Sequence, residues 1–514
     1  MNIINKRTGL LFLLATTQFA PQKLHGQGCF NPSGHLEMKA VGKSFLSVRP
    51  PFQLNSPEFL AGWWYDRMDA RGKECRNGTV QLVGFGGKST ESCDLATYFT
   101  FNYSPVLVIN EQAGLPDTDI LSEQVNIYTV NGTFKSFLAL NPKYSFGGLG
   151  ISYRQEFATN GDNRSFWFLI SSPVTVVSTG MNLKETIIND GGGVNPDATG
   201  AVPNAIQAFS QSSYKYGKIL RKNKSKASLG DITALIGYKT VFTEDYDMDG
   251  YAGLIAPTGN KVKSKELFEP MVGANHHGGF ILGSSASVTL WECHQGARID
   301  FEFSAHGQYL LQGREIRSFD LKNKPWSRYM QMYANQTDAQ AAANEASIYA
   351  YTTPGINILT QPVNVYPGFS SISNTAAVFT TCDGSKQLEI GYNFYARQSE
   401  FVELACPWQM GPALKALDAP GGTNSVQIIG NNYNSLNNVA VGDYNENLIK
   451  VSDLDMLSAT QPAIISNTLY ANAAYRSNDR EYPLFVTGGG SYEFEEDNTT
   501  LNRWTLWLKA GVSF

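Results

Sequence analysis

The densest set of residues that could do chemistry lies in residues 298–311, where charged side chains recur at alternate positions. Asp300, Glu302 and His306 fall on one face of an extended chain, with Arg298 beside them. Two carboxylates and a histidine are groups suited to acid–base catalysis, and a glycosidase holds two carboxylates at a set separation across its cleft. The same face would line a water-filled lumen if the strand belongs to a membrane barrel.

A second candidate is the acidic run Asp245, Asp247 and Asp249, which is followed by Gly250 and opens like a calcium-binding loop. The twelfth position of that loop is Ala256 instead of the bidentate Glu, so the run is not an EF-hand. We interpret it as an acidic turn, with a divalent cation as the weaker alternative, and predict no metal or cofactor. His276 and His277 are adjacent, would point to opposite faces of a strand, and are predicted to lie in a solvated turn.

Other motifs of catalysis are missing from the sequence. The chain of 514 residues has no G-x-S-x-G elbow, no P-loop and no H-E-x-x-H, so no enzyme is predicted. The net charge of -5 and the lack of a basic stripe argue against nucleic acid as a partner. Among the six cysteines, the local pairs Cys75–Cys93 and Cys382–Cys406 are candidate disulfides, with free thiols as the alternative.

Long strands with alternating faces must position these residues. Residues 298–311 place Ile299, Phe301 and Phe303 opposite the charged face, and residues 386–402 place Glu389 and Arg397 opposite another apolar face. Residues 503–514 alternate in the same way, with Lys509 on the polar side. The apolar side of this last strand, which ends the chain on an aromatic residue, resembles the C-terminal assembly signature of bacterial outer-membrane β-barrels and carries Trp504, Leu506, Leu508, Val512 and Phe514.

The chain start is typical of an exported protein. Lys6 and Arg7 precede a short apolar run, which predicts a signal peptide over residues 1–26. Residues 27–77 are predicted to form a plug-like or periplasmic segment, and residues 78–514 a barrel. The predicted fold is all-β, a transmembrane antiparallel β-barrel of about 14 strands within a range of about 12–16. Residues 331–349, which are rich in Ala, are predicted to be a helix in a long loop.

Residues 228–291 carry a family resemblance. Leu229-Gly230-Asp231-Ile232 opens a strand, Ala256-Pro257-Thr258-Gly259 follows as a hairpin, and Phe268-Glu269-Pro270 precedes another strand. This order resembles the outer-membrane proteins of phenol and aromatic meta-cleavage pathways, within the hydrophobic-substrate channels of the long-chain fatty-acid transporter type. Ser228 stands where that pattern usually has Gly, and the resemblance covers about 60 residues. It implies a barrel and the diffusion of small apolar or aromatic molecules.

The predicted function is a passive channel in the bacterial outer membrane, with outer-membrane lipid, the barrel assembly machinery and small solutes as partners. The lumen-lining candidates that would set its selectivity are Arg298, Asp300, Glu302, His306, Glu389, Arg397 and Lys509. One alternative is a structural or adhesive barrel that does not conduct. Another is a secreted soluble β-sandwich that binds a ligand. The sequence leaves the oligomeric state open.

Overall fold

A computed structural model describes the protein over part of its length. The described residues are 78–89, 106–110, 120–159, 164–198, 200–243, 245–322, 324, 326–344, 351–408, 411–415, 427–429, 438–440, 448–461, 463–477, 482–495 and 502–513. All of them belong to one compact unit, Glu37–Phe514. The predicted signal peptide and N-terminal segment, the pair Cys75–Cys93 and the terminal Phe514 lie outside the described residues.

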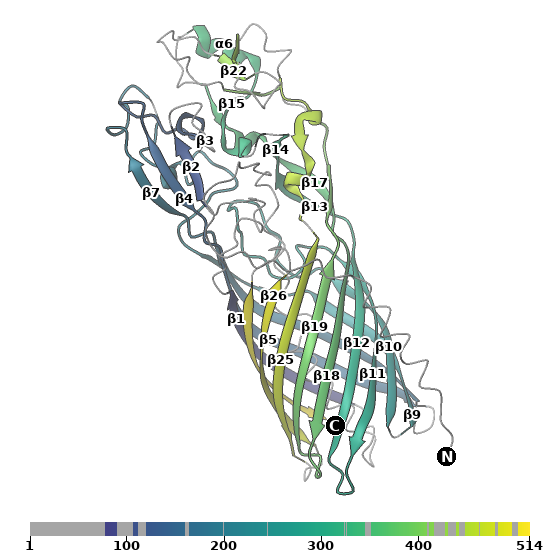
Figure 1. The fold of residues 1–514 in the computed structure, drawn as a ribbon. Helices are drawn as coiled ribbons and strands as arrows, with labels where there is room; N and C mark the ends of the chain where they lie inside the picture. The colour runs from purple at the N-terminus through teal and green to yellow at the C-terminus, as the bar shows by residue number, and fades with distance from the viewer. Residues whose placement is uncertain are drawn as a thin grey trace. The chain divides into compact units, whose positions relative to one another are not determined.

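A single antiparallel sheet closes on itself to form the barrel (Figure 1). It has thirteen strands, of which twelve form the closed wall, and the thirteenth, β8 (Lys224–Leu229), pairs only with β6. The wall strands are β1 (Gly78–Ser89), β5 (Lys143–Thr159), β6 (Arg164–Gly180), β9 (Ile232–Thr243), β10 (Tyr246–Ala256), β11 (Gly279–Glu292), β12 (Arg298–Leu310), β18 (Gly368–Thr380), β19 (Lys386–Arg397), β25 (Ile464–Arg476), β26 (Leu484–Glu495) and β27 (Arg503–Ser513). Closure is made by β1, which pairs with β27 on one side and β5 on the other.

The predicted all-β barrel is thus confirmed. Its strand number lies at the lower end of the predicted range, two below the central value. The sandwich alternative is wrong, because the strands form one closed sheet instead of two packed ones. Among the described residues, no helix is long and apolar enough to cross a membrane.

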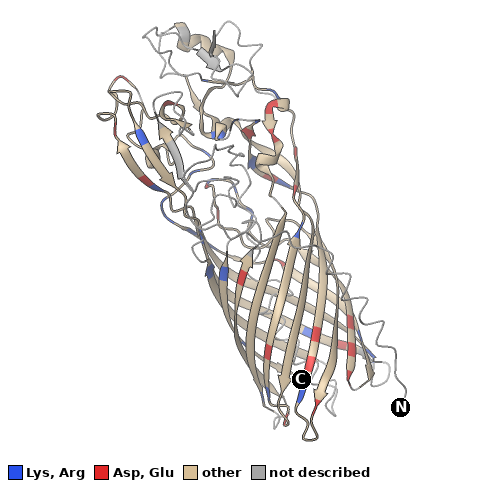
Figure 2. Cartoon of the chain, in the orientation of Figure 1, with Lys and Arg blue, Asp and Glu red and all other residues tan. Residues whose placement is uncertain are grey.

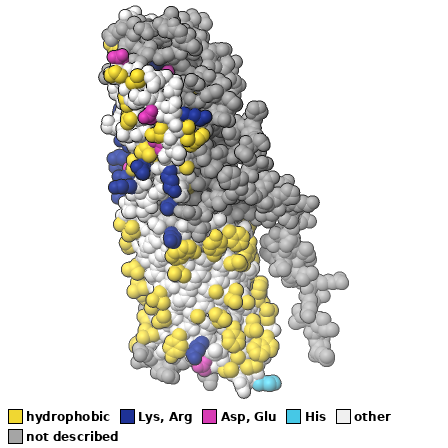
Figure 3. All heavy atoms as spheres, turned by 60° about the vertical axis from the view of Figure 1, so that its left-hand side comes forward, with side chains coloured by type: hydrophobic (Ala, Val, Ile, Leu, Met, Phe, Trp, Pro, Cys, Tyr) yellow, Lys and Arg dark blue, Asp and Glu magenta, His cyan; other side chains and the backbone are white. Residues whose placement is uncertain are grey.

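Alternation along the strands separates an apolar outer face from a polar inner face. On β27, Leu506 and Leu508 are exposed, whereas the residues that alternate with them, Thr505, Trp507 and Lys509, are buried. The same alternation runs along β12 and β19, as the sequence predicts. Hydrophobic side chains are spread over the outer face of the wall that Figure 3 shows. This is the polarity of a barrel immersed in lipid, the reverse of a soluble protein.

The two ends of the barrel differ in the length of their connections. At the end that holds Gly78 and Ser513, neighbouring strands are joined by residues 160–163, 244–245, 293–297, 381–385 and 477–483. At the opposite end, the connections are residues 90–142, 181–231, 257–278, 311–367, 398–463 and 496–502. Short periplasmic turns and long extracellular loops are characteristic of bacterial outer-membrane barrels, so we call the second end the mouth.

The long connections contain small sheets of their own. The first sheet comprises β2 (Val106–Asn110), β3 (Ile120–Leu121), β4 (Lys135–Ala139) and β7 (Lys184–Asn189), and the second comprises β13 (Gly313–Ser318), β17 (Thr360–Tyr366) and β20 (Phe401–Leu404). Shorter pairings join β14 (Asp320–Leu321) to β24 (Leu454–Asp455), β15 (Gln331–Tyr333) to β16 (Thr353–Pro354) and β21 (Ala413–Leu414), and β22 (Gln427–Ile429) to β23 (Asn438–Ala440). The α-helices are α5 (Ala205–Ala208), α6 (Gln336–Asn344) and α7 (Gly355–Ile358), with 3-10 turns η2 (Ser122–Val125), η3 (Ser327–Tyr329), η5 (Val451–Asp453) and η6 (Met456–Ala459). Helix α6 falls within the predicted helix of residues 331–349.

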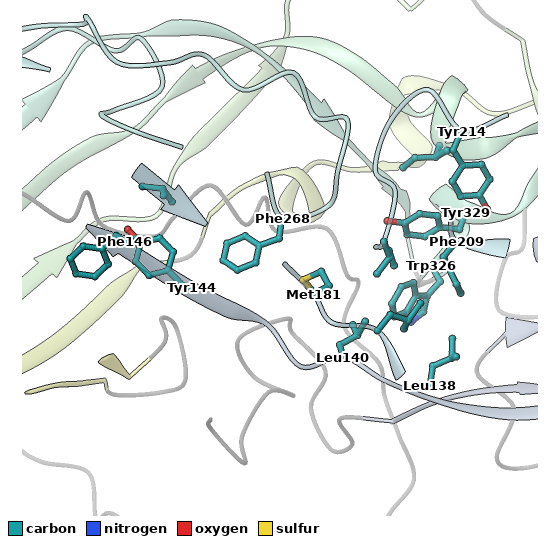
Figure 4. Packing of buried hydrophobic residues seen from close by; sticks show 14 of the residues in the cluster. Leu138, Leu140, Tyr144, Phe146, Met181, Phe209, Tyr214, Phe268, Trp326 and Tyr329 are labelled. Atoms are coloured by element: carbon teal, nitrogen blue, oxygen red, sulfur yellow. The ribbon is translucent and has the colours of Figure 1, made fainter. Parts of the chain in front are cut away.

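An aromatic cluster joins two of these connections to each other (Figure 4). Phe209 and Tyr214, from residues 181–231, pack against Trp326 and Tyr329, from residues 311–367. The Tyr329 hydroxyl donates a hydrogen bond to the Gly217 carbonyl at 2.8 Å, so the buried phenol is satisfied. Segments far apart in the sequence therefore form a common core above the barrel mouth.

The predicted disulfide between Cys382 and Cys406 is wrong, because both thiols are free. Cys382 lies in the turn before β19, and Cys406 lies beyond its far end. With a rise of about 3.3 Å per residue, the 12 residues of β19 separate them by about 40 Å, whereas a disulfide needs Cα atoms within about 7 Å. Proximity in sequence does not give proximity in space when a spanning strand lies between.

The structure brings Cys382 to a different cysteine, Cys293. Their turns are neighbours because Arg298 of β12 pairs with Thr380 of β18. Hydrogen bonds from the backbone of Gln295 and from the Cys382 thiol lower the pKa of Cys293. Under a mild thiol oxidant such as oxidised glutathione, we therefore expect Cys293 and Cys382 to lose one hydrogen each and form a disulfide. Peptide mapping without reduction would detect it, and a Cys382–Cys406 link instead would contradict the prediction.

Candidate functional site: the barrel lumen and its mouth

The inner face of the barrel is polar and holds the residues predicted to line a lumen. Asp300, Glu302 and His306 point inward from β12, Glu389 from β19 and Lys509 from β27, and all five are buried. Arg298 and Arg397 are half-buried at the ends of their strands. Figure 2 marks the acidic and basic positions on the wall strands. That these side chains set the selectivity of a channel stays a prediction.

The inward charges occur in local pairs and networks. Arg298 donates to Asp300 at 2.9 Å, and the Thr289 hydroxyl donates to the same carboxylate at 2.6 Å. The Glu389 carboxylate accepts from the Tyr470 hydroxyl at 2.6 Å and from Asn472 at 2.9 Å. Arg298 lies on the same strand as Asp300 and balances its charge, whereas the partners of Glu389 are neutral groups of the neighbouring strand β25.

Several inward residues were not among the sequence candidates. Trp167 donates its indole hydrogen to the Asp249 carboxylate at 3.1 Å, and the Arg154 guanidinium lies over the Trp167 ring at 4.5 Å. Arg503 is hydrogen-bonded to Glu493. The alternation that reveals Lys509 also places Arg154 and Arg503 inward. What alternation cannot reveal is which inward residues of different strands meet.

The acidic run splits between two environments. Asp245 is an exposed residue in the turn before β10, whereas Asp247 and Asp249 are buried on its inner face. The Asp249 carboxylate interacts with Trp167 and with Arg154, which lies 3.8 Å away. No group of three or more potential metal ligands occurs among the described residues.

A cavity of about 130 Å³ lies at the mouth end of the lumen. Its walls come from two sources, the inner faces of wall strands and the connections above them. The lining residues are Ser171, Pro173, Thr175, Gly230, Asp231, Thr233, Ile255, Met271, Val272, Gly273, Ala274, Asn275, His277, Ile281, Gln308, Leu310, Glu315, Arg317, Pro367, Gly368, Ser370, Tyr395, Arg397, Glu400 and Gln461. The cavity therefore connects the inner faces of the wall strands to the connections at the mouth.

A buried ionic cluster forms one side of this cavity. The Glu315 carboxylate accepts hydrogen bonds from His277 Nε2 at 2.8 Å and from Arg317 Nε at 2.6 Å. Arg317 also lies 3.3 Å from Glu400. These four residues come from three connections, so the cluster ties the mouth together. The prediction of a solvated turn is wrong for His277, which is buried, although His276 is exposed.

His277 carries a positive charge in this geometry. Its Nδ1 lies 2.7 Å from the Leu311 carbonyl and its Nε2 faces the Glu315 carboxylate, and neither acceptor has a hydrogen to offer. Both ring nitrogens must therefore be donors. Burial opposes this charge, but the hydrogen bond and the charge of Glu315 outweigh burial and raise the pKa of His277.

The raised pKa of His277 predicts a pH dependence of the mouth. A group with a raised pKa in the folded state contributes its stability fully below the unfolded value, about 6.5 for histidine, and loses it as the pH rises through the folded value. We expect near-UV circular dichroism to show a falling thermal midpoint as the pH rises through this window, and a smaller fall for His277→Gln. If the thermal midpoints of the two proteins fell equally, the pH dependence would not come from His277, which would contradict the prediction.

The wall is closed, its outer face is apolar and its inner face is polar, and the connections at its two ends differ in length. These features define the chain as a bacterial outer-membrane β-barrel. No family model and no curated protein matches it. Among solved structures, it is similar to an outer-membrane channel of Pseudomonas putida F1, with a TM-score of 0.37 and 9% identity over 86% of this chain and 97% of that one. It is also similar to the CymD monoaromatic hydrocarbon channel, with a TM-score of 0.28 and 7% identity over 93% and 98% of the two chains. A third similar structure is the β-domain of the Bordetella autotransporter BrkA, with a TM-score of 0.29 and 7% identity over 85% of this chain and 100% of that one. Likenesses at this level carry no conclusion about function.

Proposed function

We propose that this protein is an outer-membrane channel for the passive diffusion of small solutes. The observation that carries the proposal is the mouth cavity, because inward residues of the wall strands form its walls. A space bounded in this way lies on the path between the outside and the lumen. A polar lumen also gives a permeating solute hydrogen-bonding partners that replace those it leaves in water.

The pairing of the lumen charges points to uncharged or apolar solutes. Rings of one sign select ions, whereas opposite charges held within hydrogen-bonding distance largely cancel each other's field. Arg298 with Asp300 and Arg503 with Glu493 are such pairs. We propose accordingly that the channel discriminates weakly between cations and anions.

Conductance in planar bilayers tests the proposal. The wild-type protein should conduct with little preference for either ion, and Glu302→Gln should shift the permeability ratio towards anions. A unit charge at about 4 Å in water is worth about 1 kcal/mol, so the shift should be at most about fivefold. A barrel that is folded, as judged by faster migration of the unboiled protein on SDS gels, but does not conduct would overturn the channel proposal.

A second candidate is a barrel with a filled lumen that does not transport. It is favoured by the network of Glu389, Tyr470 and Asn374, in which the Asn374 amide donates to the Tyr470 hydroxyl at 3.1 Å. These side chains are buried and bridge neighbouring strands across the inner face. The conductance experiment separates the two candidates directly.

The partners follow from the same proposal. The apolar outer face is suited to outer-membrane lipid, and the barrel assembly machinery would recognise β27, where Leu506 and Leu508 face outward. Neither a nucleic acid nor a catalytic role for Asp300, Glu302 and His306 is part of the proposal.

A further inference from the structure

The charges around the mouth cavity cancel. Six acidic or basic residues line it, of which His277, Arg317 and Arg397 are basic and Asp231, Glu315 and Glu400 are acidic. His277 is charged by the geometry given above, and both Asp231 oxygens accept backbone hydrogens, from Gly259 at 3.0 Å and Ala274 at 2.6 Å. Three positive charges therefore face three negative ones, so the cavity offers no net attraction to an ion.

The acidic groups are also fully engaged with the protein. Glu315 is shared between His277 and Arg317, and Glu400 accepts from the Gln461 backbone at 3.1 Å besides facing Arg317. A charged ligand would have to break one of these contacts. A cation or an anion entering the cavity would thus lose its hydration without gaining a free counter-charge.

The Asn275 amide supplies a buried donor to the cavity wall. The Asn275 side chain is 4% exposed, and its Oδ1 accepts from the Val262 backbone at 2.9 Å. Its Nδ2 has no hydrogen-bond partner within the part of the chain that the structure describes. The backbone of Asn275 has a φ of 51°, a left-handed conformation that Asn and Gly tolerate best. A buried amide hydrogen without an acceptor has lost its hydration without compensation, so an acceptor on a bound molecule would stabilise it.

Apolar side chains form one part of the cavity wall, and the space is small. Ile255, Val272, Ile281 and Leu310 line the cavity beside Asn275. Its volume of about 130 Å³ is close to that of an engineered cavity of about 150 Å³ that holds benzene. The space therefore admits a molecule of about the size of a single six-membered ring.

We propose that the mouth cavity is a binding site for a small uncharged molecule with an apolar body and one acceptor oxygen, which accepts a hydrogen bond from Asn275. The inference rests on the proposed channel function, since it names the solute class that the mouth receives. It excludes ions, because the cavity charges cancel, and it ranks an oxygen-bearing solute above a pure hydrocarbon, because only the former satisfies Asn275.

Calorimetric titration of the detergent-solubilised full chain with three matched probes tests this site. Cyclohexanone is neutral with an acceptor oxygen, cyclohexanecarboxylate is an anion and cyclohexylammonium is a cation of similar size. We expect cyclohexanone to bind at least about tenfold more tightly than either ion. Tighter binding of an ion, or no binding of cyclohexanone, would overturn the proposal.

Substitutions of Asn275 give the sharper comparison. Asn275→Asp keeps the shape and the acceptor for Val262 but removes the Nδ2 donor, so cyclohexanone affinity should fall about tenfold, the fold-change expected for one hydrogen bond. Asn275→Gly removes the same donor without adding a charge. Asn364→Asp on β17 makes the same chemical change outside the cavity and is the control. Unchanged affinity in folded Asn275→Asp and Asn275→Gly would sink the assignment. A channel that conducts but does not bind cyclohexanone would contradict this inference alone, whereas binding without conductance would contradict only the proposed function.

Discussion

Replacing Leu508 by Arg should destabilise the barrel by about 2–4 kcal/mol in lipid, the measured range for a cation on the lipid face near the bilayer midplane. Leu508 is 62% exposed and lies midway along β27, between the buried residues Trp507 and Lys509. In water such an exposed position would accept Arg at almost no cost, so the size of the effect reports the surroundings of the wall. Reversible unfolding in denaturant from lipid vesicles, followed by tryptophan fluorescence, would measure it.

Leu457→Arg is the matched control for this experiment. Leu457 is 71% exposed, more than Leu508, but it lies in η6, within the connection of residues 398–463. There the new charge is hydrated, and the free energy of unfolding should change by less than about 0.5 kcal/mol. Equal effects at the two positions would show that the wall around Leu508 is not in contact with lipid.

The wall of the barrel could be predicted because its information is local. A strand between lipid and a polar lumen must alternate at every second residue, so Leu388 and Ile390 against Glu389 on β19 suffice to assign both faces. The number of wall strands is harder to predict. Lys224–Leu229 has the length of a short strand, yet it pairs only with β6, along the part of that strand nearest the mouth. Pairing partners are a property of the sheet and not of the segment.

The mouth could not be predicted because its contacts are made across long stretches of sequence. His277 meets Glu315 across 38 positions and Arg317 meets the Ala459 carbonyl across 142. A histidine in a Gly-rich turn has no local pattern that distinguishes a buried partner from a solvated one. The same limit explains the wrong disulfide prediction, because sequence proximity suggested Cys406, whereas the register of β12 and β18 places the Cys293 thiol beside Cys382.

Arg317→Met should destabilise the mouth by about 3–5 kcal/mol, the cost of removing one partner from a buried ionic cluster. Arg317 is 2% exposed, and its guanidinium contacts both Glu315 and Glu400. Methionine fills much of the space but leaves two buried carboxylates facing each other with only His277 as a cation. The loss should appear as a lower thermal midpoint of the near-UV signal, while the unboiled protein still migrates faster on SDS gels because the wall strands are intact.

Arg314→Met separates this effect from the loss of any arginine on β13. Arg314 is exposed three positions earlier on the same strand, and its contact with the Cys406 sulfur, at 3.2 Å, lies in solvent. Its removal should cost less than about 1 kcal/mol, since exposed charges gain little from their neighbours. The loss in Arg317→Met should also shrink at low pH, because protonation of Glu315 removes the repulsion that the substitution creates. A loss that is equal for the two variants, or independent of pH, would mean that the cluster does not hold the connections of the mouth together.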